Sequence, residues 1–202
     1  MKNLLKKFFT SFGIRLFAYF KKKYEQNEVN TVKTKFLHIG ENVDIQYPCR
    51  IINPQYIYIG DNFRAWSEFR IEAIDNYWGK YYNPRIVIGR NVIFHADCHI
   101  GCINEITIGN NVLAGSRVLI TDHYHGKTDD LNSDITFVKR DLFSKGKVFI
   151  DENVWIGEGV CIMPDVSIGK NCIIGANSVV TRSFPDNCVI AGSPAKIVKK
   201  LK

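Results

Sequence analysis

The sequence predicts an all-β solenoid, in which short parallel strands coil around a triangular core. Three observations lead to this fold class. An aliphatic residue recurs at every sixth position between residues 150 and 180, a small or apolar residue follows most of them four positions later, and Gly or Asn often stands between them. Neither the period of a helix nor the alternation of a plain strand accounts for a repeat of six. Short strands joined by tight turns account for it, because Gly and Asn adopt the unusual dihedrals of such turns.

The repeat itself defines each element of this solenoid. The strict run consists of Ile150, Ile156, Ile162, Ile168, Ile174 and Val180, and its corner positions are Val154, Val160, Val166, Cys172, Ser178 and Phe184. The same frame continues upstream in four sets of three: Ile39, Ile45, Ile51; Ile59, Ala65, Ile71; Ile88, Phe94, Ile100; Ile108, Ala114, Ile120. Three hexapeptides per set predict a triangular prism of about six coils, each buried only against its neighbours. A β-sandwich with coincidental spacing would not keep this phase.

Two insertions interrupt the frame, at residues 77–87 and 126–149. They are expected to extend as loops from corners of the prism, and selectivity for a bound substrate is expected to lie in them.

The N-terminal segment does not follow the repeat. Within residues 1–26, apolar and aromatic residues recur at helical spacing among Lys and Arg, which predicts an amphipathic helix. We therefore divide the chain into an N-terminal helix at 1–30 and a β-helix domain at 31–202. Two roles remain open for the helix: it covers the exposed end of the prism, or it lies on an anionic membrane surface as a peripheral contact.

Charge and cysteine content narrow the function classes. The net charge is +7, and Lys and Arg gather in the first 23 and last seven residues. An anionic ligand or membrane surface fits this distribution, whereas no fold signature of nucleic-acid binding is present. Six cysteines occur without a CxxC pair, and the basic N-terminus lacks a cleavage site. Both favour a reduced, cytoplasmic location.

The stretch VWIGEGVCIMPDVSIGKNCIIGANSVVTRSFPDNCVIAGSPAKIVKK, residues 154–200, closely resembles the hexapeptide-repeat acyltransferases, and the resemblance extends over roughly residues 39–200. Within this family the chain is most similar to sugar O-acetyltransferases of the galactoside, maltose and surface-polysaccharide type. The resemblance implies a left-handed parallel β-helix, a homotrimer with sites between subunits, and acetyl transfer from acetyl-CoA to a sugar hydroxyl in lipopolysaccharide, O-antigen or capsule biosynthesis. The alternatives are an N-acetyltransferase for an amino-sugar nucleotide, an acetyltransferase for serine or an antibiotic, and a scaffold without activity.

Acetyl transfer to a hydroxyl needs a base, and a histidine suits this role near neutral pH. The segment TDHYHG at 121–126 offers two. An ungapped count from Ile108 matches the family's catalytic histidine to His125, whereas the local T-x-H pattern matches it to His123. We favour His123, because Asp122 and the preceding strand hold it more firmly, and expect both histidines to line the site.

Further site residues follow from the resemblance. His95 replaces an asparagine that contacts the acceptor in galactoside-type enzymes, Asp97 lies two positions on, and Trp155 matches a residue near the site between subunits. Their alternatives are exposed side chains for His95 and Asp97 and plain subunit packing for Trp155.

The expected acetyl-CoA contacts are more dispersed. They are Gly115, Ala176, Thr181, Arg182, Lys196 and Lys199, with the lysines facing phosphates or forming a solvated tail. We expect no metal, because a histidine pair needs further ligands and Asp129, Asp130 and Asp134 fit a solvated acidic loop.

Overall fold

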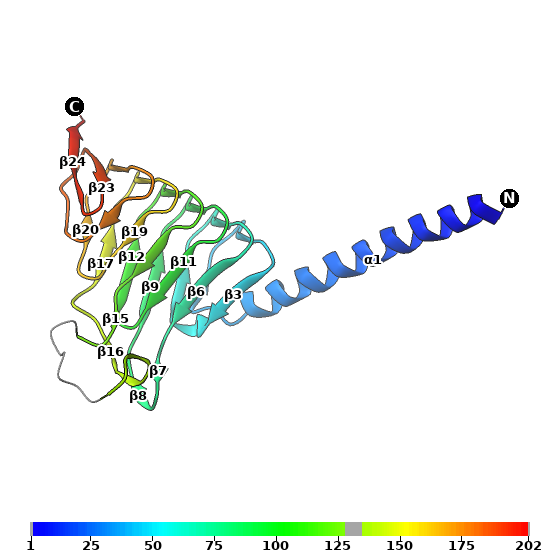
Figure 1. Ribbon diagram of the computed structural model, residues 1–202, viewed down its shortest axis with the longest axis horizontal. Helices are drawn as coiled ribbons and strands as arrows, with labels where there is room; N and C mark the ends of the chain where they lie inside the picture. Colours follow the sequence, from blue (N-terminus) through cyan, green and yellow to red (C-terminus); the bar gives the residue numbers. More distant parts are fainter. Residues whose placement is uncertain (1, 128–134, 202) are drawn as a thin grey trace.

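The computed structural model describes residues 2–127 and 135–201, and for residues 2–12 it describes the helical backbone alone. Three parallel sheets stack their strands side by side to form a three-sided solenoid, and one long helix extends from its N-terminal end (Figure 1). The core lies between the sheets and consists mainly of Ile, Val and Phe side chains.

Each turn of the solenoid contributes one strand to each sheet. Sheet A contains β1 (His38–Ile39), β4 (Ile57–Ile59), β9 (Arg85–Ile88), β12 (Glu105–Ile108), β17 (Val148–Ile150) and β20 (Ser167–Ile168). Sheet B contains β2 (Asp44–Ile45), β5 (Arg64–Ala65), β10 (Ile93–Phe94), β13 (Leu113–Ala114), β18 (Trp155–Ile156), β21 (Ile173–Ile174), β23 (Cys188–Gly192) and β24 (Ala195–Lys200). Sheet C contains β3 (Cys49–Ile52), β6 (Phe69–Ala73), β11 (His99–Cys102), β14 (Leu119–Thr121), β19 (Cys161–Ile162) and β22 (Val179–Val180).

Strand register follows the hexapeptide frame. In sheet C, Ile71 pairs with Ile100, Ile100 with Ile120, and Ile120 with Ile162. All four side chains are fully buried, and each contributes about 1.5–3 kcal/mol of stabilisation relative to exposure. Because side chains alternate along a strand, the residues on either side of each aliphatic point outward.

Asparagines form the corner between sheets A and B. Asn62, Asn91 and Asn111 all have φ near +57° (57°, 56° and 57°), a left-handed conformation that asparagine tolerates. Their side chains also form a ladder: Nδ2 of Asn62 donates to Oδ1 of Asn91 at 3.0 Å, and Nδ2 of Asn91 donates to Oδ1 of Asn111 at 2.9 Å. The predicted use of asparagine at turns is thereby confirmed.

The predicted corner positions are buried. Val154, Val160 and Val166 have no more than 1% exposure, and Cys98, Cys172 and Cys188 occupy equivalent sites in other coils. All six cysteines are free. Cys98, Cys172 and Cys188 act here as small apolar residues that fit the narrow corners.

The helix α1 (Lys2–Lys33) extends beyond the predicted boundary at residue 30 and projects from the solenoid (Figure 1). Its last turns contact the solenoid: Val29 is buried against the core, and Nζ of Lys33 donates to the carbonyl of Val43 at 2.5 Å. Residues 13–24 are exposed, so this part of the helix does not cover the end of the prism. Within the described residues, no helix has the length and apolarity needed to cross a membrane.

The two insertions contain structure of their own and meet each other. The first carries the hairpin β7 (Asn76–Tyr77) and β8 (Lys80–Tyr81), and the second carries β15 (Tyr124–His125), the 3-10 turn η2 (Phe137–Lys139) and β16 (Leu142–Phe143); a further 3-10 turn, η1 (Pro54–Tyr56), joins β3 to β4. The hydroxyl of Tyr82 donates to the carbonyl of Leu142 at 3.2 Å, and Lys80 pairs with Asp141 at 2.9 Å. The insertions therefore form one wall beside sheet C.

Candidate active site

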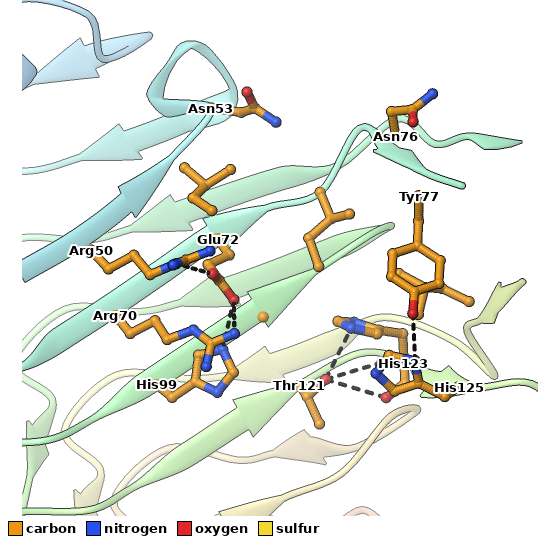
Figure 2. A pocket seen from close by; sticks show the side chains of 14 residues that line it. Arg50, Asn53, Arg70, Glu72, Asn76, Tyr77, His99, Thr121, His123 and His125 are labelled. Carbon is orange, nitrogen blue, oxygen red and sulfur yellow. Dashed lines mark hydrogen bonds and ion pairs between the residues drawn. The ribbon is translucent and has the colours of Figure 1, made fainter. Parts of the chain in front are cut away.

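A cavity of about 330 Å³ lies between the outer face of sheet C and the two insertions. Outward residues of β3, β6, β11 and β14 form its floor, and Tyr77, His125 and Leu142 form its outer wall (Figure 2). Both histidines of the TDHYHG segment line this cavity, as expected from the sequence.

His123 is held by a buried carboxylate. Its Nδ1 lies 3.0 Å from Oδ1 of Asp122, a residue with no exposed surface. Asp122 also accepts backbone N–H groups of Ile103 at 2.9 Å and Asn104 at 2.8 Å, which come from the preceding coil. Because a carboxylate only accepts, Nδ1 carries the proton and Nε2 keeps a free lone pair.

Two further contacts secure this pair. Burial raises the pKa of the Cys102 thiol well above its ordinary value, and nearby Asp122 raises this pKa further. The thiol therefore stays protonated, and it donates to Oδ2 of Asp122 at 3.2 Å. The hydroxyl of Thr121 lies 3.3 Å from Nδ1 of His123. The His123 ring therefore has little freedom to rotate.

His125 has a different environment. It is exposed on β15, and its Nδ1 lies 3.3 Å from the hydroxyl of Tyr77, which donates to the carbonyl of Val138 at 3.0 Å. The two rings meet edge to face at 5.5 Å between centroids. His125 thus joins the two insertions, and in the described residues it has no carboxylate partner.

A charged cluster occupies the opposite side of the cavity. Glu72, whose side chain is 5% exposed, accepts hydrogen bonds from Nε of Arg50 at 2.8 Å and from Arg70 at 2.6 Å, and lies 3.2 Å from Nε2 of His99 (Figure 2). Burial alone would raise the pKa of Glu72, but the hydrogen bonds from His99, Arg70 and Arg50 together outweigh it and lower the pKa to about 2. Glu72 is therefore ionised at neutral pH.

Gly101 separates the two histidines of sheet C. A Cβ atom at this position would lie 3.3 Å from Cε1 of His123 and 3.4 Å from Nε2 of His99. Both rings thus flank the space that the missing side chain leaves open. This opening brings a small group within reach of His123.

Comparison with known proteins identifies the family. Residues 147–182 match the family described as bacterial transferase hexapeptide (six repeats). A protein of Escherichia coli (strain K12), WbbJ, whose name describes an O-acetyl transferase of lipopolysaccharide biosynthesis, is 38% identical over 166 residues, which is 77% of this chain and 78% of WbbJ. The chain belongs to the hexapeptide-repeat acyltransferase family.

Solved structures of this family agree with the fold. The N-acyltransferase AntD from Bacillus cereus, in complex with dTDP-4-amino-4,6-dideoxyglucose and coenzyme A, is 25% identical with a TM-score of 0.71, covering 88% of this chain and 89% of AntD. A maltose O-acetyltransferase from Clostridium difficile 630 is 29% identical with a TM-score of 0.58, covering 88% and 76%. The solenoid is thus the left-handed parallel β-helix of the acyltransferases.

The acyltransferase chain does not bring every predicted residue to the cavity. His95 lies on the outer face of sheet B, where its ring stacks on Trp66 with centroids 4.3 Å apart, and Trp155 lies 54% exposed on the same sheet. Asp97 is exposed at the corner between sheets B and C, with φ +60°. Within one chain His95 and His123 follow strands of different sheets, β10 and β14, so the acceptor contact expected of His95 in a site between subunits stays a prediction.

The residues predicted to bind the acyl donor lie outside the cavity, in two groups. The first follows the corner between sheets B and C: a Cβ on Gly115 would lie 2.8 Å from the amide of Glu158, and a Cβ on Gly157 would lie 2.6 Å from the amide of Ala176. This column reaches Lys196, because Gly175 contacts Ala191 and Ala191 pairs with Lys196. Lys199 pairs with Val189 on the same ribbon.

The second group follows the last strand of sheet C. Thr181 and Arg182 are exposed just after β22, and the Arg182 guanidinium lies 5.4 Å from the centre of the Phe184 ring. Within one chain these two residues and the glycine column lie on different faces of the acyltransferase.

In the described part of the chain, no group of three His, Cys, Asp or Glu side chains is placed to hold a metal ion. Asp129, Asp130 and Asp134 lie outside the described residues.

The cluster around Glu72 was missed by the sequence analysis. Arg50, Arg70 and His99 each precede the third aliphatic of a set, namely Ile51, Ile71 and Ile100. The frame therefore contained the signal: residues at the same position of successive sets share one outer face.

Proposed function

We propose that this acyltransferase moves an acetyl group from acetyl-CoA to a sugar hydroxyl, and that the acceptor is a building block of lipopolysaccharide or another surface polysaccharide. The observation that carries the proposal is the Asp122–His123 pair beside the cavity, with Nε2 of His123 left for a substrate. The names of WbbJ and of the maltose O-acetyltransferase support acetyl transfer to an oxygen.

The chemistry follows from the atoms of this pair. The acceptor hydroxyl approaches Nε2 through the opening at Gly101, gives its proton to Nε2, and its oxygen bonds to the thioester carbonyl. Collapse of the tetrahedral intermediate breaks the carbon–sulfur bond, and the CoA sulfur takes the proton from His123. Asp122 remains ionised throughout, because it orients the ring and stabilises the imidazolium that forms.

The acyl donor is proposed to lie along the column of Gly115, Gly157 and Ala176, which contains two small residues that the family resemblance assigns to it, Gly115 and Ala176. Lys196 at the end of the column offers charge to a phosphate. Coenzyme A in the AntD complex supports an acyl-CoA donor.

A homotrimer is part of this proposal. Trp155 belongs to sheet B and His95 directly follows β10 of that sheet, whereas His123 follows β14 of sheet C. A second subunit that places its sheet B against the cavity would bring all three together. Exposed Trp155 and Leu113 provide apolar surface on sheet B for such a contact.

N-acyl transfer to an amino-sugar nucleotide is the second candidate. The observation that favours it is the TM-score of 0.71 to AntD, compared with 0.58 for the maltose enzyme. Both reactions use the same base, and they differ in the nucleophile that enters at Gly101.

The deciding experiment measures acceptor-dependent release of CoA thiol from acetyl-CoA by the purified full-length protein. The acceptors are neutral sugars, nucleotide sugars, dTDP-4-amino-4,6-dideoxyglucose and serine. We expect a sugar to stimulate release and to yield an acetyl group that mild alkali removes, as an ester. An alkali-stable amide would select the second candidate, and no stimulation by any acceptor would reject acetyl transfer to this panel.

For α1 we propose peripheral contact with an anionic membrane at the cytoplasmic face. Ile14, Phe17, Phe20 and Tyr24 are 58–71% exposed, and Lys21, Lys22 and Lys23 lie among them. Aromatic and basic side chains on one unpartnered helix match the interface of an anionic lipid surface.

A further inference from the structure

The cluster of Arg50, Arg70, Glu72 and His99 has no role in the base chemistry, although it lines the same cavity as His123. Arg50 and Arg70 pair directly across neighbouring strands, and Arg70 pairs with His99 on the next strand. Like charges at directly opposed positions repel each other. One carboxylate, Glu72, lies among these three residues.

The charge of this cluster is not balanced by Glu72. Two permanently charged guanidinium groups face a single carboxylate, so the cluster carries a net positive charge before any contribution from His99. In the described residues neither arginine has another ion pair. Glu68 and Asp97 lie with both arginines around a neighbouring hollow at the corner of sheets B and C, and neither of these acids forms an ion pair there with Arg50 or Arg70.

The arginines also keep donors for a ligand. Arg50 uses Nε for Glu72 and Arg70 uses one terminal nitrogen, whereas each guanidinium has five N–H donors. Glu72 lies on the same outer face of sheet C as the two arginines and holds both groups at the floor of the cavity, with its side chain 5% exposed while those of Arg50 and Arg70 are 67% and 48% exposed. The remaining donors are therefore oriented in advance on the solvent side, where they match the oxygens of a phosphate or carboxylate.

We propose that Arg50, Arg70 and His99 form an anion subsite, and that the acceptor is an anionic sugar bearing a phosphate or a carboxylate. This proposal rests on the proposed acetyl transfer at His123. Adjacent strands are about 4.8 Å apart, so the arginines lie one and two strands beyond His99, which flanks the opening at Gly101. An anion roughly 5–10 Å from the acetylated hydroxyl fits the width of about one sugar ring.

A binding experiment tests the subsite independently of catalysis. Full-length protein saturated with CoA, so that donor phosphates are already bound, is titrated calorimetrically with UDP, inorganic pyrophosphate and glucuronic acid. We expect at least one probe to bind, and Arg50→Gln and Arg70→Gln each to weaken it tenfold or more. Arg85→Gln is the matched control, because Arg85 is exposed on β9 of sheet A, away from the cavity and from sheet B; this variant should bind like wild type.

Kinetics distinguish the acceptor from the donor. The arginine variants should raise KM for an anionic acceptor far more than KM for the corresponding neutral sugar, with KM for acetyl-CoA unchanged. The phosphate and carboxylate arms show which anion is used. Arg50→Lys keeps the positive charge but loses the planar guanidinium, so it should weaken binding less than Arg50→Gln. This ranking separates loss of the anion contact from a folding defect.

The proposal fails if no probe binds, if Arg85→Gln weakens binding as much as the cavity variants do, or if those variants raise KM for acetyl-CoA instead. If a probe binds through Arg50 and Arg70 but no sugar is acetylated, the anion subsite stands and the proposed function falls.

Discussion

At the scale of single residues, His123 and His125 are two positions apart and differ in the group that contacts Nδ1 of the ring. Asp122 bonds Nδ1 of His123 and is itself fixed by two backbone N–H groups of the preceding coil. His125 instead contacts Tyr77 at the cavity wall. This difference gives the pair distinct expected mutant behaviour.

We expect His123→Ala to lower kcat/KM for acetyl transfer by about 10²–10⁴-fold, the usual contribution of a general base. His125→Ala is the matched control, with a loss of about tenfold or less that falls mainly on the KM of the acceptor. Thiol release from acetyl-CoA measures both variants. The reverse ranking would assign the base to His125.

Asp122→Asn should lower kcat by roughly 100-fold or more while leaving KM for acetyl-CoA unchanged. An amide can donate to Nδ1 and so favour the wrong tautomer of His123. Rescue distinguishes positioning from folding: Asp122→Glu, if folded, should keep more activity than Asp122→Asn. Equal activity of Asp122→Asn and wild type would remove Asp122 from the mechanism.

Glu72 has a consequence for stability that depends on pH. Its pKa in the folded protein, about 2, is below the ordinary value of 4.5, so its stabilising effect is present above pH 4.5 and is lost as the pH falls toward 2. We expect Glu72→Gln to lower the free energy of unfolding by about 2 kcal/mol at pH 7. Urea unfolding at fixed protein concentration should show this difference shrinking steadily between pH 4.5 and pH 3; a constant difference would contradict the assignment.

At the scale of elements, the solenoid and α1 follow opposite rules of burial. The central aliphatics of the strands pack against those of the adjacent coils, whereas residues 13–24 of α1 are exposed. The aromatic surface of α1 therefore needs a partner outside the chain, and the proposed membrane contact supplies one.

Sedimentation with lipid vesicles checks this contact. The full-length protein should bind vesicles containing anionic phosphatidylglycerol and bind much less to neutral phosphatidylcholine, with binding lost as salt increases. Phe17→Glu with Phe20→Glu should reduce binding at least tenfold without lowering acetyl transfer to a soluble acceptor. Equal binding of wild type and the double variant would exclude α1 as the contact.

At the scale of the whole molecule, the separation of sheets B and C means that one chain alone does not bring His123 and Trp155 together. The cavity with His123 lies on sheet C, and Trp155 lies on sheet B. A site that uses both residues must be shared between two subunits, which a cyclic trimer provides three times.

Mixing two inactive variants tests the shared site. If His123 of one subunit works with Trp155 of the next, trimers reassembled from equal amounts of His123→Ala and Trp155→Ala should recover about a quarter of wild-type activity, because three quarters of them are mixed and each of these has one intact site. Recovery of no activity would place both residues in one subunit's site, and full activity of Trp155→Ala alone would remove it from the site.

The repeat was sufficient to predict the three-sided solenoid and the inward side chains, because burial every sixth residue is a local rule repeated along the chain. It also placed both histidines at the start of the second insertion. It could not choose between His123 and His125, since the choice depends on how Asp122 bonds to residues 18 and 19 positions earlier in the sequence.

The sequence by itself thus determined the architecture, the family resemblance and the segment that carries the candidate base. Only the tertiary structure decided that His95 and His123 face different sides, that Tyr77 closes the cavity over His125, and that Arg50, Arg70 and His99 gather around Glu72. The physical reason is common to all three: these contacts join residues from different coils and insertions, and their energies depend on which face of the prism each residue occupies.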